Sequence, residues 1–504
     1  MTKSFYTHVS TWGDNLLYRG VENGRRIRKR IPYRPTLYTR SKTPTTLTTL
    51  DGTFVEPIHP GTMKECKAYI ETFKYVPGGE VYGNDKFNYA YLAEQYPDDV
   101  DWSIKDILVA NIDIEVGSEN GFPDPDFANE EITAITIKIR DQYHVFGCGV
   151  FTHSRLDVSY YKCKDEVELI SIFLKFWCRH YPDAVTGWNC KTFDFPYIIN
   201  RIKKIMGEET ARKMSPWGNL MEREFTVMGR LQKFYDISGV VILDYLEIYR
   251  KFADKGASQE SYKLNAIAHV ELGEKKLSYE EYDNLHQLYR QNYQKFIEYN
   301  IQDVALVDKL DSKLGLIELV LTLAYEAKAN YDDVLAQTRM WDALTYNHLI
   351  KQNIVFPPKK DNIKTHAYKG AYVKDPLVGM HHWVASFDLQ SLYPHLIIFN
   401  NISPETLIEP REYPDWMRSF VSKNVIDVDN LLDEKIDTSL LKQHNITLTP
   451  NGQFFRKDKQ GFLAKMMEDM YKERAVYKKK MIEEMKRLQE IEKELDKRKK
   501  DSTK

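Results

Sequence analysis

A nearly unbroken apolar run at residues 107–116, ILVANIDIEV, constrains the fold of this chain more than any other feature. Such a run is typical of a strand buried in the middle of a sheet. Two acids interrupt it, and because strand side chains alternate, Asp113 and Glu115 face the same side. Adjacent carboxylates in an apolar strand repel one another and are costly to bury unless a cation lies between them. The alternative, an edge strand with two solvated acids, is disfavoured by the apolar residues on both sides.

The pattern around this run predicts an α/β domain. A second apolar segment at 131–139 predicts another strand, and an amphipathic pattern at 168–181 predicts a helix that ends before Pro182. Strands and helices in alternation are the pattern of an α/β domain. The period is helical again from 278 to about 328, whereas the first hundred residues predict short strands separated by turns.

The last third of the chain predicts a linker, one more buried strand and a long helix. PPKKDNIKTH at 357–366 has the composition of a linker, and WVASFDLQSLYP at 383–394 predicts the strand. The final forty residues lack Pro and Gly and predict a helix. An apolar stripe recurs along it amid charges: Met481, Met485, Leu488, Ile491 and Leu495. A helix that cannot bury such a stripe alone usually packs against a partner.

Composition narrows the class of protein. The chain has 504 residues, 42% hydrophobic and 29% charged, which is typical of a globular protein of several domains. Its net charge is -2, so any binding of nucleic acid must use local basic surfaces. The five cysteines include no CxxC pair, and no apolar run has the roughly 18–20 residues of a membrane-spanning helix. We therefore expect a cytoplasmic protein with no membrane partner.

Two further acidic motifs follow the first. In WNCKTFDFP at 188–196, Asp194 follows a turn and opens a helix. In YNIQD at 299–303, Tyr299 and Asp303 lie four residues apart and therefore share one helical face. Each motif is weak alone, because YxxxD occurs by chance in many helices. The three motifs in this order and with these gaps are a strong signal.

Four carboxylates can hold two hard divalent cations about 3.5–4 Å apart, which is the arrangement that hydrolyses phosphodiesters by in-line displacement. Mg²⁺ prefers oxygen ligands and keeps positions open for water and phosphate, and Mn²⁺ accepts the same ligands. We expect Asp113, Glu115, Asp194 and Asp303 to be metal ligands and catalytic residues, and Tyr299 to orient the attacking water. The predicted activity is that of a 3′→5′ exonuclease.

The three motifs resemble the proofreading-exonuclease motifs of the family B DNA polymerases, and the chain is similar to the replicative members from large-tailed bacteriophages. The similarity extends to YGNDKFNYAYL at 82–92, VILDYLEIYRKF at 241–252 and HAYKGAYVKDP at 366–376. If phage-encoded, the protein would act in the cytoplasm of the host cell. The resemblance implies primer-template and single-stranded DNA, dNTPs and replisome proteins such as a sliding clamp as partners.

The resemblance also implies a mixed α/β, multidomain fold. Its parts are an N-terminal domain at 1–106 to which 316–359 return, an RNase H-like exonuclease domain at 107–315, a partial palm at 360–460 and the start of a fingers helix at 461–504.

SFDLQSLYP at 386–394 resembles the first polymerase motif of the family. The resemblance implies that Asp388 is catalytic and binds two further Mg²⁺ ions, and that Tyr393 lies beneath the sugar of the incoming nucleotide. The backbone of Leu389, Ser391 and Leu392 would then lie against its triphosphate.

Two other segments resemble parts of the polymerase site. Arg474 and Lys478 lie four apart on a predicted helix and resemble the fingers residues that hold the triphosphate, although a solvated basic face is the alternative. Tyr368, Gly370 and Ala371 resemble the YxGG/A segment that contacts template DNA.

Two motifs of the family, KxxxNSxYG and YGDTDS, are absent from this sequence. Because Asp388 alone cannot hold two metals, we expect no polymerisation by these residues alone. The economical hypothesis is the N-terminal part of a split polymerase, with a second polypeptide supplying the remaining palm, fingers and thumb; a truncated polymerase would look the same. The alternatives are a stand-alone exonuclease and a regulatory DNA- or RNA-binding fragment, and the four retained carboxylates argue against the latter.

Overall fold

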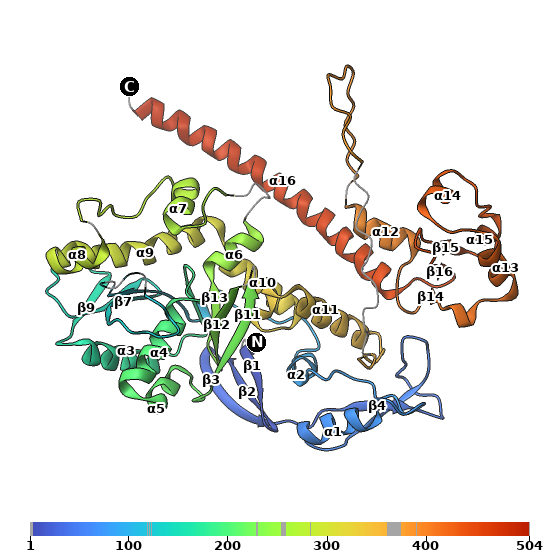
Figure 1. The fold of residues 1–504 in the computed structure, drawn as a ribbon, viewed down its shortest axis with the longest axis horizontal. Coiled ribbons are helices and arrows are strands. Elements are labelled where there is room, and N and C mark those ends of the chain that lie inside the picture. The colour runs from blue at the N-terminus through green and yellow to red at the C-terminus, as the bar shows by residue number, and fades with distance from the viewer. Residues whose placement is uncertain are drawn as a thin grey trace. The chain divides into compact units, whose positions relative to one another are not determined.

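The structure is a computed structural model (Figure 1), and it describes residues 4–117, 119, 121, 123–227, 230–253, 259–282, 284–359, 374–389 and 391–502. Two compact units make up the chain: Met1–Arg40 with Glu56–Lys351, and Ser41–Val55 with Gln352–Lys504. No helix among the described residues has both the length and the apolar character needed to cross a membrane. Helices and sheets occur in both units, which confirms the predicted mixed α/β fold.

A six-stranded sheet forms the centre of the first unit. The predicted strands at 107–116 and 131–139 are confirmed as two central, antiparallel neighbours, β6 and β7. On its other edge β6 pairs in parallel with β10. The strand order is β13 (Val241–Asp244), β10 (Ala184–Gly187), β6 (Val109–Val116), β7 (Ile132–Ile139), β8 (Gln142–Gly147) and β9 (Val158–Lys162).

Helices cover both faces of this sheet (Figure 1). Ile112 and Ile114 of β6 pack into one core with α3 (Glu166–His180) and α4 (Asp194–Met206). On the opposite face lies α9 (Tyr293–Leu314), which contacts β6 and β7. Since side chains alternate along a strand, Asp113 and Glu115, which alternate with these isoleucines, face α9. The predicted helix at 168–181 is confirmed as α3.

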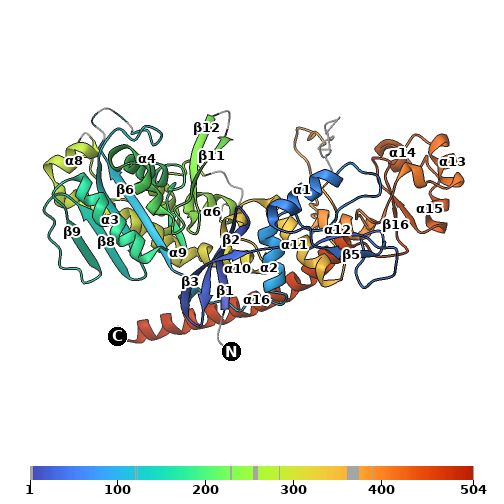
Figure 2. The same ribbon diagram turned by 90° about the horizontal axis from the view of Figure 1, so that it is seen from below.

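The first unit also contains elements outside the central sheet and its covering helices. Two strands, β11 and β12, form a separate antiparallel hairpin (Figure 2). The bounds of the hairpin strands and of the other helices are β11 (Leu220–Val227), β12 (Arg230–Ile237), α5 (Glu208–Ala211), α6 (Tyr245–Phe252), α7 (Leu264–Leu272), α8 (Leu285–Gln291), α10 (Leu316–Ala327) and α11 (Gln337–Lys351).

The N-terminal sheet consists of β1 (Ser4–Trp12), β2 (Asn15–Glu22) and β3 (Arg25–Pro32). The segment after α10 contacts β1: the Tyr6 hydroxyl donates to the Ala329 carbonyl at 2.8 Å, and the Val9 amide donates to Asn330 Oδ1 at 2.9 Å. Residues that follow α9 therefore pack on the N-terminal sheet. The domain boundaries drawn from the sequence stay a prediction.

The prediction of strands over the first hundred residues missed two helices, α1 (Met63–Phe73) and α2 (Phe87–Gln95). The first begins with a capping box, in which Thr62 and Glu65 each accept a hydrogen bond from the other's backbone amide. This T-x-x-E signal is visible in the sequence. The second helix is buried on most sides and so lacks the one-sided apolar period by which helices are recognised. The strands there are β4 (Leu37–Arg40) and β5 (Val55–Ile58).

Buried Asp183 connects the N-terminal sheet to the central sheet. Its carboxylate pairs with Arg19 and Arg26, each at 2.9 Å, and accepts the Leu108 amide at 2.9 Å. These contacts hold the start of β6, whose far end carries the acidic residues.

The second unit has its own small core around a three-stranded sheet, in the order β14, β16, β15. Ile408, Met417, Phe420 and Phe454 belong to this core. Its elements are β14 (Leu407–Ile408), β15 (Ile446–Leu448), β16 (Phe454–Arg456), α12 (Leu392–Asn400), α13 (Asp415–Lys423), α14 (Val428–Leu432), α15 (Ser439–Gln443) and α16 (Phe462–Ser502).

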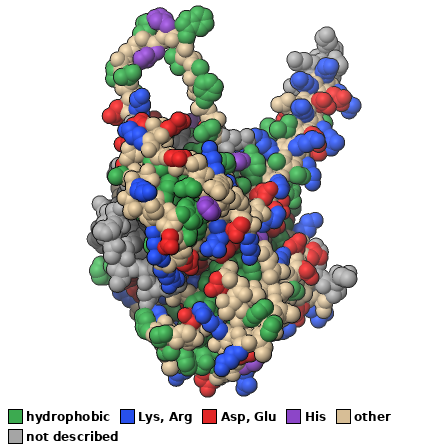
Figure 3. Space-filling view, turned by 90° about the vertical axis from the view of Figure 1, so that its right-hand side faces the viewer, with side chains coloured by type: hydrophobic (Ala, Val, Ile, Leu, Met, Phe, Trp, Pro, Cys, Tyr) green, Lys and Arg blue, Asp and Glu red, His purple; other side chains and the backbone are tan. Residues whose placement is uncertain are grey.

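The predicted buried strand at 383–394 is wrong. Residues 374–389 form neither helix nor strand, and α12 begins at Leu392. Their apolar side chains form an exposed arch (Figure 3), on which Trp383 is fully exposed and Phe387 is 91% exposed. A buried strand needs hydrogen-bonded neighbours and a cover on each face, and no described strand pairs with this segment. Most of the predicted linker, from residue 360, lies outside the described residues.

The predicted C-terminal helix is confirmed as α16, and its start is tied to the segment NISPET at 401–406. Glu405 accepts the Phe462 amide at 2.6 Å, and Ser403 accepts the Leu463 amide at 3.3 Å. These acceptors satisfy amides of the first helical turn, which have no partner within the helix. Further along, the side chains of the apolar stripe are about half exposed.

Candidate active site

Three of the predicted acidic residues form one cluster. Asp113 and Glu115 of β6 and Asp303 of α9 each offer an oxygen, and these atoms lie within 4.8 Å of one another. The two segments are distant in sequence and meet because α9 crosses the face of the sheet to which both strand acids point. The structure therefore brings together the first and third predicted motifs.

Asp194 lies beside this cluster at the first position of α4. It is buried, and its Oδ1 accepts the backbone amide of Ile114, the residue between the two strand acids, at 3.0 Å. The loop before it is held by Asp244, which accepts the amides of Asn189 at 3.1 Å and Lys191 at 3.0 Å. The second motif thus reaches the same strand through its backbone.

Lys276 is a residue of the site that sequence reasoning missed. Its ammonium group pairs with Asp303 and donates to the Tyr299 hydroxyl at 3.2 Å. It therefore joins the acid and the tyrosine of the third motif. No spacing rule singles it out, since it lies in a charged loop between α7 and α8.

Asn300 is a second missed residue. Its Nδ2 donates to Asp113 Oδ2 at 2.7 Å, and its Oδ1 accepts a hydrogen bond from the Thr136 hydroxyl on β7. It lies inside the YNIQD motif, so its proximity to the site could have been inferred, although its partner could not.

Burial dominates the electrostatics of the cluster. It raises the pKa of Glu115 to about 8 and the pKa of Asp194 to about 7, and the pKa of Asp113 well above its ordinary value. The pKa of Asp303 is also raised by burial, although Lys276 opposes the shift. Burial disfavours the charge of Lys276, but Asp303, Tyr299 and Asp113 together raise its pKa.

These residues fit a hard divalent cation. Carboxylate oxygens are the ligands that Mg²⁺ and Mn²⁺ prefer. Asp303 Oδ1 is buried and has no hydrogen-bond partner among the described residues. A buried acceptor without a donor is costly, and a cation would satisfy it.

A cavity of about 1020 Å³ opens beside the cluster, and Asp113, Lys276 and Tyr299 line it. Its walls include Trp188 and Tyr262, which are joined by a hydrogen bond of 3.1 Å from the indole to the tyrosine carbonyl. Exposed aromatic faces next to lysine and arginine side chains are the surfaces on which single-stranded nucleic acids stack.

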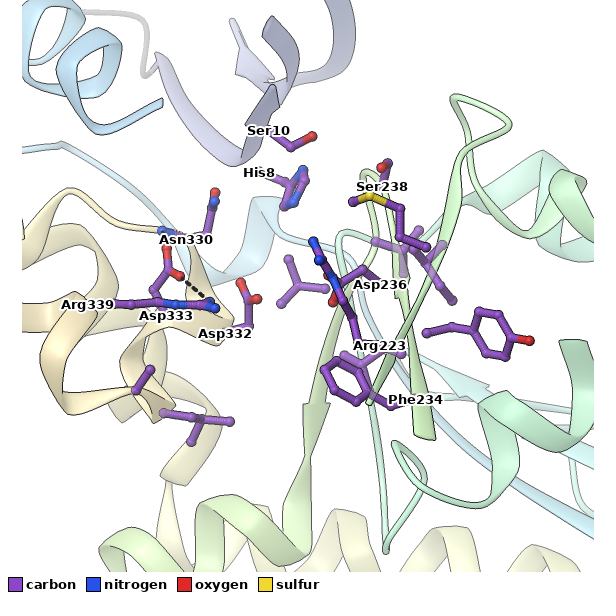
Figure 4. A pocket seen from close by; sticks show the side chains of 18 of the residues that line it. His8, Ser10, Arg223, Phe234, Asp236, Ser238, Asn330, Asp332, Asp333 and Arg339 are labelled. Atoms are coloured by element: carbon purple, nitrogen blue, oxygen red, sulfur yellow. Dashed lines mark hydrogen bonds and ion pairs between the residues drawn. The ribbon is translucent and has the colours of Figure 1, made fainter. Parts of the chain in front are cut away.

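A second cavity, of about 810 Å³, contains none of the predicted site residues. His8 and Ser10 line one side, Asp332 to Arg339 another, and Arg223, Phe234 and Asp236 a third (Figure 4). The cations that line it are engaged: Arg223 pairs with Asp236 at 2.9 Å and Arg339 with Asp333 at 3.0 Å. The others also have partners: Lys191 pairs with Glu247, Lys86 with Asp342, and Lys251 donates to the carbonyls of Val334 and Leu335.

Most of the predicted polymerase residues that the structure describes are exposed on the second unit. Asp388, Leu389 and Tyr393 are exposed, and Ser391 precedes α12 with a φ of 52°. Leu392 is the first residue of α12. Tyr368, Gly370 and Ala371 lie outside the described residues.

Arg474 and Lys478 are exposed on α16, which packs against α12. The contact includes an edge-to-face pair of the His395 and Tyr471 rings, whose centroids are 4.6 Å apart. The two helices that carry Tyr393 and the basic pair are therefore neighbours, and the role of the pair stays a prediction.

Comparison with known proteins decides the family. A model described as "DNA polymerase family B, exonuclease domain" matches residues 86–267, and one described as "DNA polymerase family B" matches residues 335–500. The chain belongs to DNA polymerase family B. The first match contains Asp113, Glu115 and Asp194. The second contains Asp388, Arg474 and Lys478.

Phage polymerases are among the relatives of this family B chain. The DNA-directed DNA polymerase of Enterobacteria phage T4 is 30% identical over 96% of the chain and 54% of its own length. That of Escherichia phage RB69 is 31% identical over 94% and 54%. The DNA polymerase delta catalytic subunit of Schizosaccharomyces pombe is 23% identical over 74% and 34%. The chain spans about half the length of the phage relatives.

The raised carboxyl pKa values predict a pH-dependent effect of metal on stability. A carboxyl group with a raised pKa stabilises the fold at low pH, and this stability is lost as the pH rises through the folded value. The metal-free protein should therefore melt several degrees lower at about pH 9 than at about pH 6, because the Glu115 pKa is about 8. Thermal unfolding in EDTA measures this.

Mg²⁺ should raise the melting temperature more at the higher pH, because metal binds the deprotonated carboxylates. In the Asp303→Asn variant the effect of Mg²⁺ should shrink. An equal or larger effect of Mg²⁺ at the lower pH contradicts the assignment of this cluster as the metal site.

Replacing Lys276 tests whether its contacts with Asp303 and Tyr299 matter. We expect Lys276→Met to lower metal-dependent nuclease activity about 10–100-fold, because groups that orient metal ligands have effects of this size. Lys275→Met is the matched control, since Lys275 is exposed and lines the same cavity. Equal activities of the two variants would show that Lys276 is dispensable.

Proposed function

We propose that this family B chain is a metal-dependent 3′→5′ exonuclease that degrades the primer strand of DNA. The observation that carries the proposal is the cluster of half-buried Asp113 with buried Glu115 and Asp303, next to Asp194, which is bonded to the backbone between the two strand acids. Four carboxylates at one point of a buried sheet have no structural advantage without cations. The aromatic and basic cavity beside them supports a nucleic-acid substrate.

Each residue has a role in this proposal. Asp113, Glu115, Asp194 and Asp303 hold two divalent cations, with Mg²⁺ proposed and Mn²⁺ as a substitute. Such ions activate water and stabilise the leaving oxygen of a phosphodiester. Tyr299 lies beside Asp303 on α9, and its hydroxyl orients the attacking water. Lys276 holds both side chains in place through its ammonium group.

Template-directed nucleotidyl transfer is a separate proposal for the second unit. Asp388 would bind metal, Leu389, Ser391, Leu392 and Tyr393 the incoming nucleotide, Arg474 and Lys478 its phosphates, and Tyr368, Gly370 and Ala371 the template. The exposure of Asp388 and of the arch that contains it supports a site completed by groups outside these 504 residues. We propose a second polypeptide with the remaining palm, fingers and thumb as their source. A sliding clamp and the host cytoplasm stay predictions from the resemblance.

The exonuclease proposal is tested with a single-stranded oligonucleotide labelled at its 5′ end. With Mg²⁺ the protein should produce a ladder that shortens from the 3′ end, and EDTA should abolish it. Asp113→Ala and Asp303→Asn should each lower the activity to the level in EDTA, because each removes a ligand that the remaining carboxylates cannot replace.

Asp308→Asn is the matched control for this assay. Asp308 lies on α9 like Asp303, but it pairs with Lys138 outside the cluster. It should retain activity. A wild-type protein that leaves the oligonucleotide intact in Mg²⁺ and in Mn²⁺ would favour the regulatory fragment instead.

Primer extension tests the polymerase proposal. In an Asp113→Ala background, which protects the primer, the chain alone should incorporate no dNTP, because one carboxylate cannot hold two metals. Adding a polypeptide that carries the KxxxNSxYG and YGDTDS motifs should produce extension, and Asp388→Ala should abolish it. Extension by the chain alone would refute the need for a second polypeptide. If Asp388→Ala had no effect in any assay, the stand-alone exonuclease would be favoured.

A further inference from the structure

A relay of two buried side chains, Thr136 and Asn300, reaches Asp113 through two hydrogen bonds. Thr136 and Asn300 are both completely buried, the first on β7 and the second on α9. The Thr136 hydroxyl donates to Asn300 Oδ1, and Asn300 Nδ2 donates to Asp113 Oδ2 at 2.7 Å. Thr136 is also the direct cross-strand neighbour of Asp113 in the β6–β7 register.

Asp113 and Thr136 together fix which end of the amide faces the acid, because an ionised carboxylate can only accept and the hydroxyl donates to the amide oxygen. An asparagine amide offers a donor at one end and an acceptor at the other. With Oδ1 accepting from the hydroxyl, Nδ2 is directed at Asp113 Oδ2, and this bond becomes charge-assisted when Asp113 gives up its proton to bind a cation. The opposite orientation would place an amide oxygen against the carboxylate. One oxygen of Asp113 is thereby held, and the rotation of the carboxylate is restricted.

We infer that Thr136 and Asn300 position Asp113 for metal binding and so set the metal affinity of the site. The inference rests on the proposed nuclease function for its biological role, but its claim concerns the binding of a divalent cation. Asn300 is a positioning residue, because its amide touches the ligand Asp113 and offers the metal only an NH₂ group. A fixed carboxylate loses less conformational freedom when it coordinates an ion, and partners of metal ligands have measurable effects on affinity for this reason.

Asn111 provides a matched comparison within the same interface. It lies on β6 two residues before Asp113, on the same face, and it is buried. Its Nδ2 donates to the backbone carbonyl of Val304 on α9 at 2.8 Å. Removing this amide therefore costs a buried hydrogen bond between the same strand and the same helix without touching a carboxylate.

The experiment measures Mn²⁺ binding to the full chain without DNA, by calorimetry and by the electron paramagnetic resonance signal of free Mn²⁺. Asn300→Ala should weaken binding about 10–100-fold, the usual effect of removing the partner of a metal ligand. Thr136→Val, which keeps the shape of the side chain, should also weaken Mn²⁺ binding, but by less than Asn300→Ala does. Thr136→Ser, which keeps the hydroxyl, should bind Mn²⁺ as the wild type does. Asn111→Ala should bind Mn²⁺ as the wild type does.

Melting temperatures of the variants show whether each one folds. In the nuclease assay, Asn300→Ala should require more metal for half-maximal activity, with an unchanged KM for DNA. Wild-type affinity in Asn300→Ala, or an equal loss in Asn111→Ala, would overturn the inference. If Mn²⁺ binding weakens in Asn300→Ala as expected but the wild type does not degrade DNA, the proposed function fails and the inference stands.

Discussion

The first unit depends on one contact, the packing of α9 across the central strand β6. It brings Asp303 within 4.8 Å of Asp113 and Glu115, so that negative charge is concentrated where water is largely excluded. Isolated charges in such a place are costly, and the raised carboxyl pKa values express this cost. The apolar side of β6, packed against α3 and α4, provides the stability that permits it. A site built in this way is a poor structural core and a good cation-binding site.

The groups around the cluster divide its oxygens between them. Lys276 forms an ion pair with Asp303 Oδ2, and Asn300 donates a hydrogen bond to Asp113 Oδ2. The Ile114 amide donates to Asp194 Oδ1. Each donor comes from a different element, a loop, a helix and a strand. The carboxylates are consequently oriented before any ion binds, which reduces the entropy lost on binding. The same donors explain why the cluster is compatible with a folded protein.

The second unit presents a different situation, because its chemistry-bearing residues are exposed. The NISPET segment serves as a cap for α16 and joins it to the end of α12, so the two helices with Tyr393, Arg474 and Lys478 are fixed relative to one another. The arch with Asp388 has no such support among the described residues. In the polymerase proposal, α12 and α16 would form the scaffold of the nucleotide site, and the second carboxylate would come from the YGDTDS motif that this sequence lacks.

The sequence by itself determined the strand β6, the helices α3, α9 and α16, and the three acidic motifs, because alternation and helical period are local properties of the chain. It predicted which acids would meet, since their order and gaps matched a family. It could not reveal Lys276, Thr136 or the partner of Asn300, because these contacts depend on how a loop, a strand and a helix cross. It also predicted a buried strand at 383–394, where the structure has an exposed arch up to residue 389 and the helix α12 from Leu392. The sequence shows which residues are apolar, but whether they are buried depends on the neighbours that the tertiary structure places around them.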